Sequence, residues 1–215
     1  KIEGNGTAVA GALFPPHLGP AYQEALRQHM DLTKAAEELA AAGYTAKNAD
    51  GYVTKDGKEL ELTVNVWGSK TEIYEALQNQ LKQAGIKATI RRIQNSEESK
   101  TKRDFDLTES NWITLATNDP FWYIDQTLRS TSEENVGHYS NPEVDSLLKR
   151  MADATDTKER LAIAGQIEEL ALQDTPSLFL FSVANQVVAT SKVSGVYMHP
   201  IDYYLITKDL KIGGK

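Results

Sequence analysis

The sequence of 215 residues contains no cysteine, so disulfide cross-links and thiol chemistry are excluded, and cysteine gives no evidence about the compartment. A chain of this length buries about 70% of the surface that its unfolded form exposes, so its core needs no covalent cross-link. Acidic residues outnumber basic ones by 30 to 23, which gives a formal net charge of −7. This acidity argues against broad binding to nucleic acids or to anionic membranes.

Long apolar runs are absent as well. No stretch approaches the roughly 20 apolar residues that a helix needs to span a bilayer. The first residues, Lys1-Ile-Glu-Gly-Asn-Gly6, lack the apolar segment of a signal peptide. They read instead as the end of a helix followed by a glycine stop, so we expect the chain to be a fragment of a longer protein.

Sequence signatures of catalysis are also missing. The chain has no His-Glu-x-x-His, no Gly-x-Ser-x-Gly and no glycine-rich loop ending in Lys-Ser or Lys-Thr. The four histidines, His17, His29, His138 and His199, are far apart, and none has a metal-ligand partner at short spacing. We therefore predict no enzyme, no cofactor and no metal site, with His138 and His199 as the remaining candidate ligands.

What the chain does contain is a regular alternation of helix and strand patterns. The predicted helices span residues 31–42, 70–84, 120–129, 142–153 and 157–173, and residues 94–103 are helical or loose. The predicted strands span residues 60–67, 86–93, 105–113 and 177–190, after a loop-like segment 1–22 and a hairpin at Asp56-Gly57. Strand 60–67, the helix and strand 86–93 predict a parallel pair with a right-handed crossover. The fold class is α/β, with a mixed sheet and flanking helices.

The clearest local signal is the start of the helix at residues 142–153. Asn141 is a preferred capping residue, and Pro142 stands at the first helical position, where its missing N–H costs nothing. The apolar residues that follow at helical spacing are Val144, Leu147, Leu148 and Met151. A second helix follows near Asp156 and carries Arg160. We therefore expect a capped helix whose apolar stripe is buried.

The candidate binding segment is residues 111–123, where a predicted strand runs into a loop rich in aromatic and polar residues. Ligands of open α/β sheets collect beyond the carboxyl ends of strands, and small-molecule sites combine aromatic side chains with a few polar groups. The predicted site residues are Asn111, Trp112, Ile113, Thr114, Leu115, Asn118, Asp119 and Trp122. The alternative is that Trp112 and Trp122 belong to the core and that Asn118-Asp119-Pro120 only caps the next helix.

Several segments occur in an order typical of one known family. They are Gly11-Ala-Leu-Phe-Pro-Pro16, Asp31-Leu-Thr-Lys-Ala-Ala-Glu-Glu-Leu-Ala-Ala-Ala-Gly-Tyr44, Leu81-Lys-Gln-Ala-Gly-Ile86, Phe105-Asp-Leu107 through Trp112 with Asp119-Pro120, Tyr139-Ser-Asn-Pro-Glu-Val-Asp145, Arg160 and Pro176. Together they resemble the C-terminal lobe of the family 5 extracytoplasmic solute-binding proteins, the peptide- and nickel-type receptors of ABC importers.

The resemblance implies a lobe like that of the type II periplasmic binding proteins, occupying residues 1–215, with a tail at residues 193–215 that packs on a missing N-terminal lobe. It implies capture of a small-molecule ligand, a peptide or a nickel or other metal chelate, and its delivery to an ABC permease in the membrane. It further implies an extracytoplasmic location, either periplasmic or lipid-anchored at the cell surface as a lipoprotein.

One departure from the family pattern concerns the ligand. Peptide-binding members carry an acidic residue shortly after the cleft tryptophan, whereas here no acid follows Trp112 until Asp119, which matches a separate Asp-Pro pair. The resemblance therefore leaves peptide and chelate open, and His138 lies too far along the chain to match the nickel-type histidine. Two other classes also remain open: an enzyme lobe whose catalytic partner domain is missing, and a receptor-derived sensor or interaction module.

Overall fold

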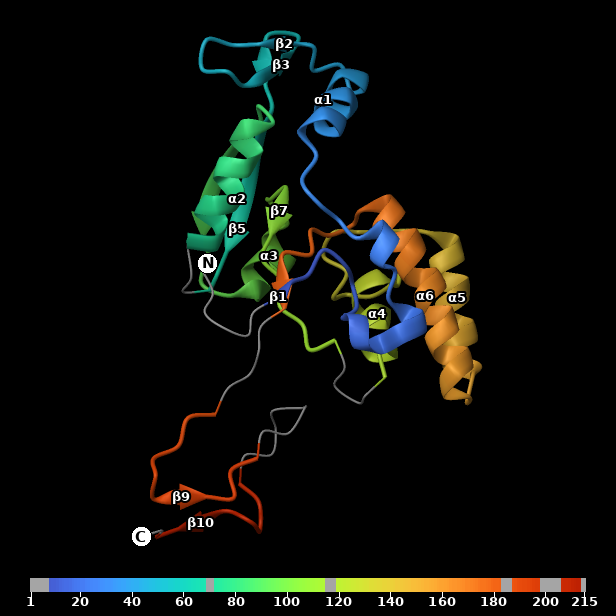
Figure 1. Cartoon of the computed structure of the whole chain (residues 1–215). Helices are drawn as coiled ribbons and strands as arrows, with labels where there is room; N and C mark the ends of the chain where they lie inside the picture. Colours follow the sequence, from blue (N-terminus) through green and yellow to red (C-terminus); the bar gives the residue numbers. More distant parts are fainter. Residues whose placement is uncertain (1–7, 69–71, 115–118, 183–186, 198–205, 214–215) are drawn as a thin grey trace. The chain divides into compact units, whose positions relative to one another are not determined.

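The computed structural model describes residues 8–68, 72–114, 119–182, 187–197 and 206–213 (Figure 1). The chain forms two compact units. One unit combines the N-terminal segment that ends at Gln28 with the chain from Ile113 onward, and the other is the continuous segment His29–Trp112. The prediction of a single lobe over residues 1–215 stays a prediction.

A parallel sheet of three strands organises the unit His29–Trp112. Its strands are β5 (Glu61–Val66), β6 (Lys87–Arg92) and β7 (Leu107–Thr108), in the order β6-β5-β7. Helix α2 (Glu72–Gln83) connects β5 to β6. The predicted parallel pair is confirmed, with Val66 opposite Arg92 at one end of the ladder.

The predicted strand 105–113 is wrong in its length, because β7 contains only two residues. It pairs with β5 alone, and its last partner is Asn65. The backbone N–H of Glu109 adds one more hydrogen bond, to the carbonyl of Asn65 at 2.8 Å. Because β5 ends at Val66, no strand in the described part of the chain pairs with the residues beyond Glu109, and Trp112 lies outside the sheet.

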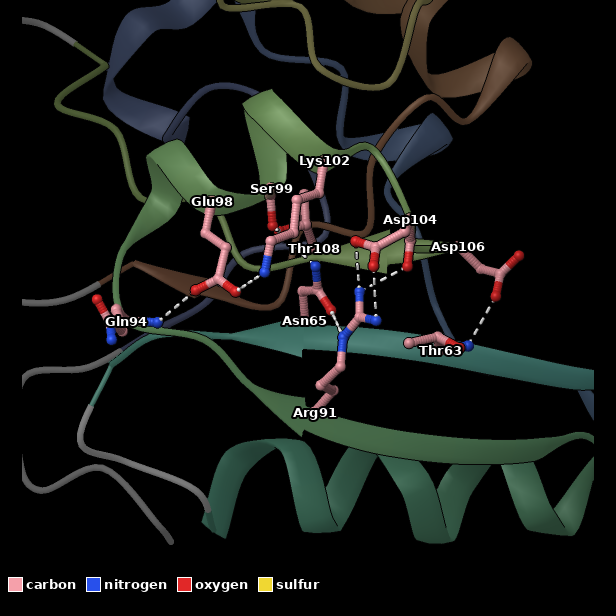
Figure 2. Close-up of polar contacts among 10 residues, drawn as sticks. All are labelled: Thr63, Asn65, Arg91, Gln94, Glu98, Ser99, Lys102, Asp104, Asp106 and Thr108. Carbon is pink, nitrogen blue, oxygen red and sulfur yellow. Dashed lines mark hydrogen bonds and ion pairs between the residues drawn. The ribbon is translucent and has the colours of Figure 1, made fainter.

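Both faces of this sheet are covered. Val64 and Val66 of β5 pack with Ala88 against Tyr74 and Leu81 of α2. Helix α3 (Ser96–Lys102), in the segment predicted as helical or loose, covers the opposite face (Figure 2). Alternation of apolar and polar residues along residues 60–67 predicts that only the face with Val64 and Val66 is buried, but Asn65 is fully buried beneath α3 as well.

The first part of the same unit is a helix followed by a small antiparallel sheet. Helix α1 (Leu32–Ala41) begins where predicted, because the Asp31 carboxylate accepts the N–H groups of Thr33 and Lys34, both at 2.9 Å. No residue of α1 is buried. The sheet consists of β2 (Ala46–Lys47), β3 (Val53–Lys55) and β4 (Lys58–Glu59). The predicted hairpin is confirmed, since Asp56 and Gly57 both have positive φ, 53° and 76°.

The other unit is mainly helical. Its elements are β1 (Ala8–Val9), the 3-10 helices η1 (Pro16–Ala21) and η2 (Glu24–Leu26), α4 (Phe121–Leu128), α5 (Pro142–Asp153), α6 (Thr157–Asp174), β8 (Phe181–Ser182), β9 (Val193–Ser194) and β10 (Lys211–Ile212). Helix α6 packs against α5 and η1, and α4 packs against α5. β1 pairs with β8, and β9 pairs with β10, both antiparallel. Within the described residues of the predicted strand 177–190, only Phe181–Ser182 is strand.

The capped helix is confirmed. The side-chain oxygen of Asn141 accepts the N–H groups of Glu143 at 2.9 Å and Val144 at 3.5 Å, with Pro142 at the first helical position. All four residues of the predicted apolar stripe are buried. The α/β class is confirmed too, and among the described residues the parallel and antiparallel strand pairs lie in separate small sheets.

Candidate ligand-binding edge

The carboxyl ends of the three parallel strands lie at one edge of the sheet. Val66 of β5 is opposite Arg92 of β6, and Asn65 is opposite Thr108 of β7. In open α/β sheets this edge is where ligands bind, because the loops that leave it converge there. The residues at and just beyond these strand ends are therefore the candidate site in this unit.

Charged and aromatic side chains are held together at this edge. The carboxylate of Glu109 accepts the backbone N–H groups of Trp67 at 2.8 Å and Gly68 at 2.9 Å. The indole Nε1 of Trp67 points back to the carbonyl oxygen of Glu109 at 3.4 Å. Nη1 of Arg92 donates to the carbonyl oxygen of Gly68 at 3.3 Å. We call the residues Trp67, Gly68, Arg92 and Glu109 the strand-end cluster.

Tyr74 adds a phenol to this cluster from the first turns of α2. Partial burial raises the pKa of Tyr74 well above its ordinary value. The nearby charge of Glu109 and a hydrogen bond to Glu109 raise this pKa further. The phenol therefore keeps its proton throughout the physiological range and acts as a donor to Glu109.

A second polar network supports the same strands from beneath α3 (Figure 2). Nε of Arg91 donates to the side-chain oxygen of Asn65 at 2.8 Å, and Nδ2 of Asn65 donates to the Ser99 hydroxyl at 3.0 Å. The Ser99 and Thr108 hydroxyls are 2.8 Å apart. The Arg91 guanidinium also forms two bonds with the Asp104 carboxylate, at 2.7 and 2.9 Å, and these lower the pKa of that carboxyl. Because every buried polar group here has a partner, the network fixes α3 on the three strands.

A cavity of about 380 Å³ also lies along α3, but its chemistry does not suit a small-molecule site. Its lining residues are Gln94, Asn95, Glu97, Glu98, Thr101 and Lys102. Glu98 is already bonded to Lys102 at 2.6 Å, and this bond lowers the pKa of the Glu98 carboxyl. Small-molecule sites are lined mainly by apolar and aromatic groups, which this cavity lacks.

The predicted site residues are divided between the two compact units. Asn111 is exposed and Trp112 is half-buried, with its Nε1 donating to the Ser110 hydroxyl at 2.7 Å. Ile113, which is 42% exposed, and the half-buried Thr114 belong to the other unit. Leu115 and Asn118 lie outside the described residues. That these residues converge on one site stays a prediction.

Asp119 is engaged in a structural ion pair. Its two oxygens receive Nε and Nη2 of Arg160 at 2.7 and 2.9 Å, and one of them also accepts the N–H of Phe121 at 2.8 Å. Arg160 in turn donates to the carbonyl oxygens of Met151 and Ala154 at the end of α5. These contacts match the alternative in which Asp119 caps the next helix, and a ligand role for Asp119 stays untested.

Trp122 differs from its neighbours on α4. Its side chain is 46% exposed, whereas Tyr123 and Ile124 are buried. The alternative that places Trp122 in the core is therefore wrong, and the side chain is accessible to a ligand or a partner.

The two candidate metal ligands gain no further support. His138 is exposed, with a φ of 54°, and His199 lies outside the described residues. In the described part of the chain, no three side chains of metal-ligating type come together.

Sequence reasoning missed the strand-end cluster. Trp67, Arg92 and Glu109 all fall inside or at the end of predicted strands, so they were read as strand residues. The available signal was topological: once strands 60–67 and 86–93 are predicted to be parallel, their carboxyl ends must share an edge.

Among the described helices, none has the length and apolar character needed to cross a membrane.

Several known proteins are similar to this chain in sequence and in fold. Residues 2–135 match the family described as bacterial extracellular solute-binding proteins, family 5 Middle. The oligopeptide-binding protein AppA of Bacillus subtilis (strain 168) is 30% identical over 183 residues, which are 81% of this chain and 34% of AppA. The nickel-binding protein NikA of Staphylococcus aureus (strain NCTC 8325 / PS 47) is 28% identical over 159 residues, 73% of this chain and 32% of NikA.

A solved structure gives the same result. The crystal structure of a nickel ABC transporter from Bacillus halodurans has a TM-score of 0.74 to this chain at 26% identity, and the match covers 96% of this chain and 44% of the other. The chain thus spans about a third of the length of the curated relatives it matches. Those relatives are named as binding proteins, not as enzymes.

Proposed function

Because the chain belongs to the family 5 bacterial extracellular solute-binding proteins, we propose that it is the solute-capture lobe of an ABC-importer receptor. Its ligand is a peptide or a metal chelate, the two classes named for its relatives AppA and NikA. The observation that carries the proposal is the strand-end cluster, which places an indole and charged groups at the carboxyl edge of a parallel sheet, where solutes bind in folds of this class.

Two of the predicted residues extend this site within the same compact unit. Trp112 follows β7 and supplies a second aromatic surface, with Asn111 as a polar neighbour. A solute role for Ile113, Thr114, Leu115, Asn118 and Trp122 remains a prediction from the sequence, and Asp119 is held by its ion pair with Arg160. No carboxylate that could receive a peptide ammonium group stands directly after Trp112. We therefore expect the ligand to be held mainly through stacking and through its polar or anionic groups.

The proposal includes partners that this chain does not contain. An N-terminal lobe forms the opposite wall of the site, and a membrane permease receives the solute. The tail at residues 193–215 packs on that lobe, which would cover apolar side chains exposed here, such as Ile206 and Ile212, at 85% and 83%. The protein is extracytoplasmic, periplasmic or anchored by a lipid, and it is not an enzyme.

The test is to identify the solute in the whole protein. Native mass spectrometry of the full-length protein, purified from its host, should show a bound peptide or a nickel complex. Calorimetric titration with defined tripeptides to nonapeptides, and separately with Ni(II) plus L-histidine, should then give saturable binding for one of the two classes. Binding of neither class, or chemical conversion of an added probe, would contradict the proposal.

A further inference from the structure

One residue at the binding edge, Gly68, is held through both its backbone N–H and its backbone carbonyl. The N–H of Gly68 donates to Glu109 at 2.9 Å, and the carbonyl oxygen of Gly68 accepts from Arg92 at 3.3 Å. Gly68 follows β5, whereas Arg92 ends β6 and Glu109 follows β7. Two oppositely charged side chains therefore join the ends of all three strands through a single residue.

A side chain at Gly68 would displace the Glu109 carboxylate from its present position. A Cβ atom at this position would lie 2.8 Å from Oε1 of Glu109, closer than such atoms approach. The other oxygen of the same carboxylate accepts the N–H of Trp67 at 2.8 Å as well as that of Gly68. Nε1 of the Trp67 indole donates a hydrogen bond to the backbone carbonyl oxygen of Glu109 at 3.4 Å. Both the backbone and the ring of Trp67 are thus held by Glu109.

We propose that Glu109 and Arg92 are positioning residues for solute capture: they hold the backbone N–H and carbonyl of Gly68, and Glu109 also holds Trp67, so that its indole is fixed at the binding edge. The inference rests on the proposed function, because it assumes that this edge meets the solute. Its physical reason is preorganisation: an aromatic side chain that is already ordered loses less conformational freedom when a ligand binds. Glu109 acts through Trp67 and is not itself required to touch the solute.

The variants Glu109→Ala and Glu109→Gln separate positioning from folding. The alanine removes both acceptor oxygens, whereas glutamine keeps one oxygen and the shape of the side chain. Glu61→Ala is the matched control, because Glu61 stands at the amino end of β5, the strand that Trp67 follows, and is bonded to Lys87 at 3.2 Å and Thr89 at 2.8 Å. If Glu109→Ala fails to fold, the same measurements on Glu109→Gln and Arg92→Ala decide the question.

Two measurements are made on each variant. Amide hydrogen exchange by NMR follows the N–H groups of Trp67 and Gly68, and fluorine NMR of protein labelled with 5-fluorotryptophan follows the Trp67 ring. In Glu109→Ala we expect both amides to exchange at least about tenfold faster, because their bonds to the carboxylate are gone. We expect the Trp67 fluorine signal to shift as well, because the backbone that carries the ring is no longer held by that carboxylate. Glu109→Gln should show a smaller change, and Glu61→Ala none. Unchanged exchange at both amides in Glu109→Ala would overturn the inference.

Solute titrations on the full-length protein then separate this inference from the proposed function. With the Ni(II) plus L-histidine and peptide probes, Glu109→Ala should bind about tenfold more weakly than the parent, with Glu109→Gln in between and Glu61→Ala unchanged. Faster exchange with unchanged affinity would overturn the positioning role while leaving the proposed function in place. If the parent binds no probe, the proposed function fails, and the positioning role fails with it.

Discussion

At the scale of single residues, the ion pair between Asp119 and Arg160 links the start of α4, the end of α5 and α6. Two bonds to Arg160, followed by the bond from the Phe121 N–H, lower the pKa of the Asp119 carboxyl despite its partial burial. Arg160 continues to the carbonyl oxygens at the end of α5. Loss of the charge on Asp119 should therefore weaken the contacts that join these three helices.

We expect Asp119→Asn to lower the free energy of unfolding by about 1–2 kcal/mol at pH 7, the scale of hydrogen bonds to a charged group. Because the folded-state pKa is depressed, the stabilisation is present above the unfolded pKa and is lost as the pH falls through the folded pKa. Urea midpoints at pH 7 and pH 3 should show a smaller difference from the parent at pH 3. The exposed Glu97, which pairs with Lys100, supplies the control, since Glu97→Gln should change little at either pH. Equal losses at both pH values would contradict the argument.

For a second residue, Glu168 on α6, the contribution to stability depends on pH in the opposite direction. Its fully buried carboxyl accepts the N–H groups of Gln23 at 2.7 Å and Phe14 at 3.3 Å. Burial raises the pKa of Glu168 to about 7, although these bonds act to lower it. The titratable side chains that feel its charge are Tyr22 and Tyr123. Between about pH 4.5 and 7 the folded chain therefore binds more protons at this site than the unfolded chain.

This proton excess means that the contribution of Glu168 to stability falls as the pH rises from 4.5 to 7. The neutral variant Glu168→Gln cannot titrate, so its stability relative to the parent should be higher at pH 8 than at pH 5. Urea denaturation at the two pH values measures this difference. Glu169→Gln, at the exposed neighbouring position on α6, should change the urea midpoint by the same amount at both pH values. A Glu168→Gln difference that does not vary with pH would show that the carboxyl titrates normally.

The sequence alone could not single out Glu168. Its two backbone partners are 154 and 145 residues away along the chain, so no local pattern marks it, and with 30 acidic residues a Glu168-Glu169 pair reads as chance. Asp119 was identified, but as a ligand candidate and as a cap. Its partner Arg160 lies 41 residues further on, which spacing cannot predict.

At the scale of elements, the helices were predictable because their start signals are local. Asp31, Asn141 and Asp156 all cap the helices that follow them, as their sequence context indicates. Strand lengths depend on neighbours. β7 is short because β5 ends beside it, and Asn65 is buried because α3 covers a face that alternation assigns to solvent.

The N-terminal cap of α5 leads to a prediction about the free energy of unfolding. Asn141→Ala should cost about 1 kcal/mol of unfolding free energy, because the N–H groups of Glu143 and Val144 lose their acceptor. The loss of the bond from Asn141 Nδ2 to Asp174, at 2.8 Å, adds to this cost. Pro142→Ala should change stability far less, since either residue suits the first helical position. Thermal melting of both variants beside the parent checks the claim, and equal melting temperatures for Asn141→Ala and the parent would remove it.

At the scale of the whole molecule, family and fold class could be predicted from the order of short motifs, whereas the site could be predicted only in part. The segment around Trp112 was found because aromatic residues cluster there in the sequence. Trp67, Arg92 and Glu109 become neighbours only through the parallel pairing of β5 with both β6 and β7, and Glu109 is 42 residues from Trp67. No short stretch of the sequence contains these three residues together.

Trp112 tests whether the binding edge works as proposed in the complete receptor. Because its side chain is only half-buried and lies outside the sheet, Trp112→Ala should cost no more than about 1.5 kcal/mol of stability in the 215-residue chain. In the two-lobe protein the same change should weaken solute binding by about 1–3 kcal/mol, the scale of a buried aromatic contact, and Trp112→Phe should restore much of the loss. Denaturant titration of the chain and calorimetry of the full-length protein measure the two effects. A stability loss of about 3–5 kcal/mol with unchanged affinity would assign Trp112 to the core and remove it from the site.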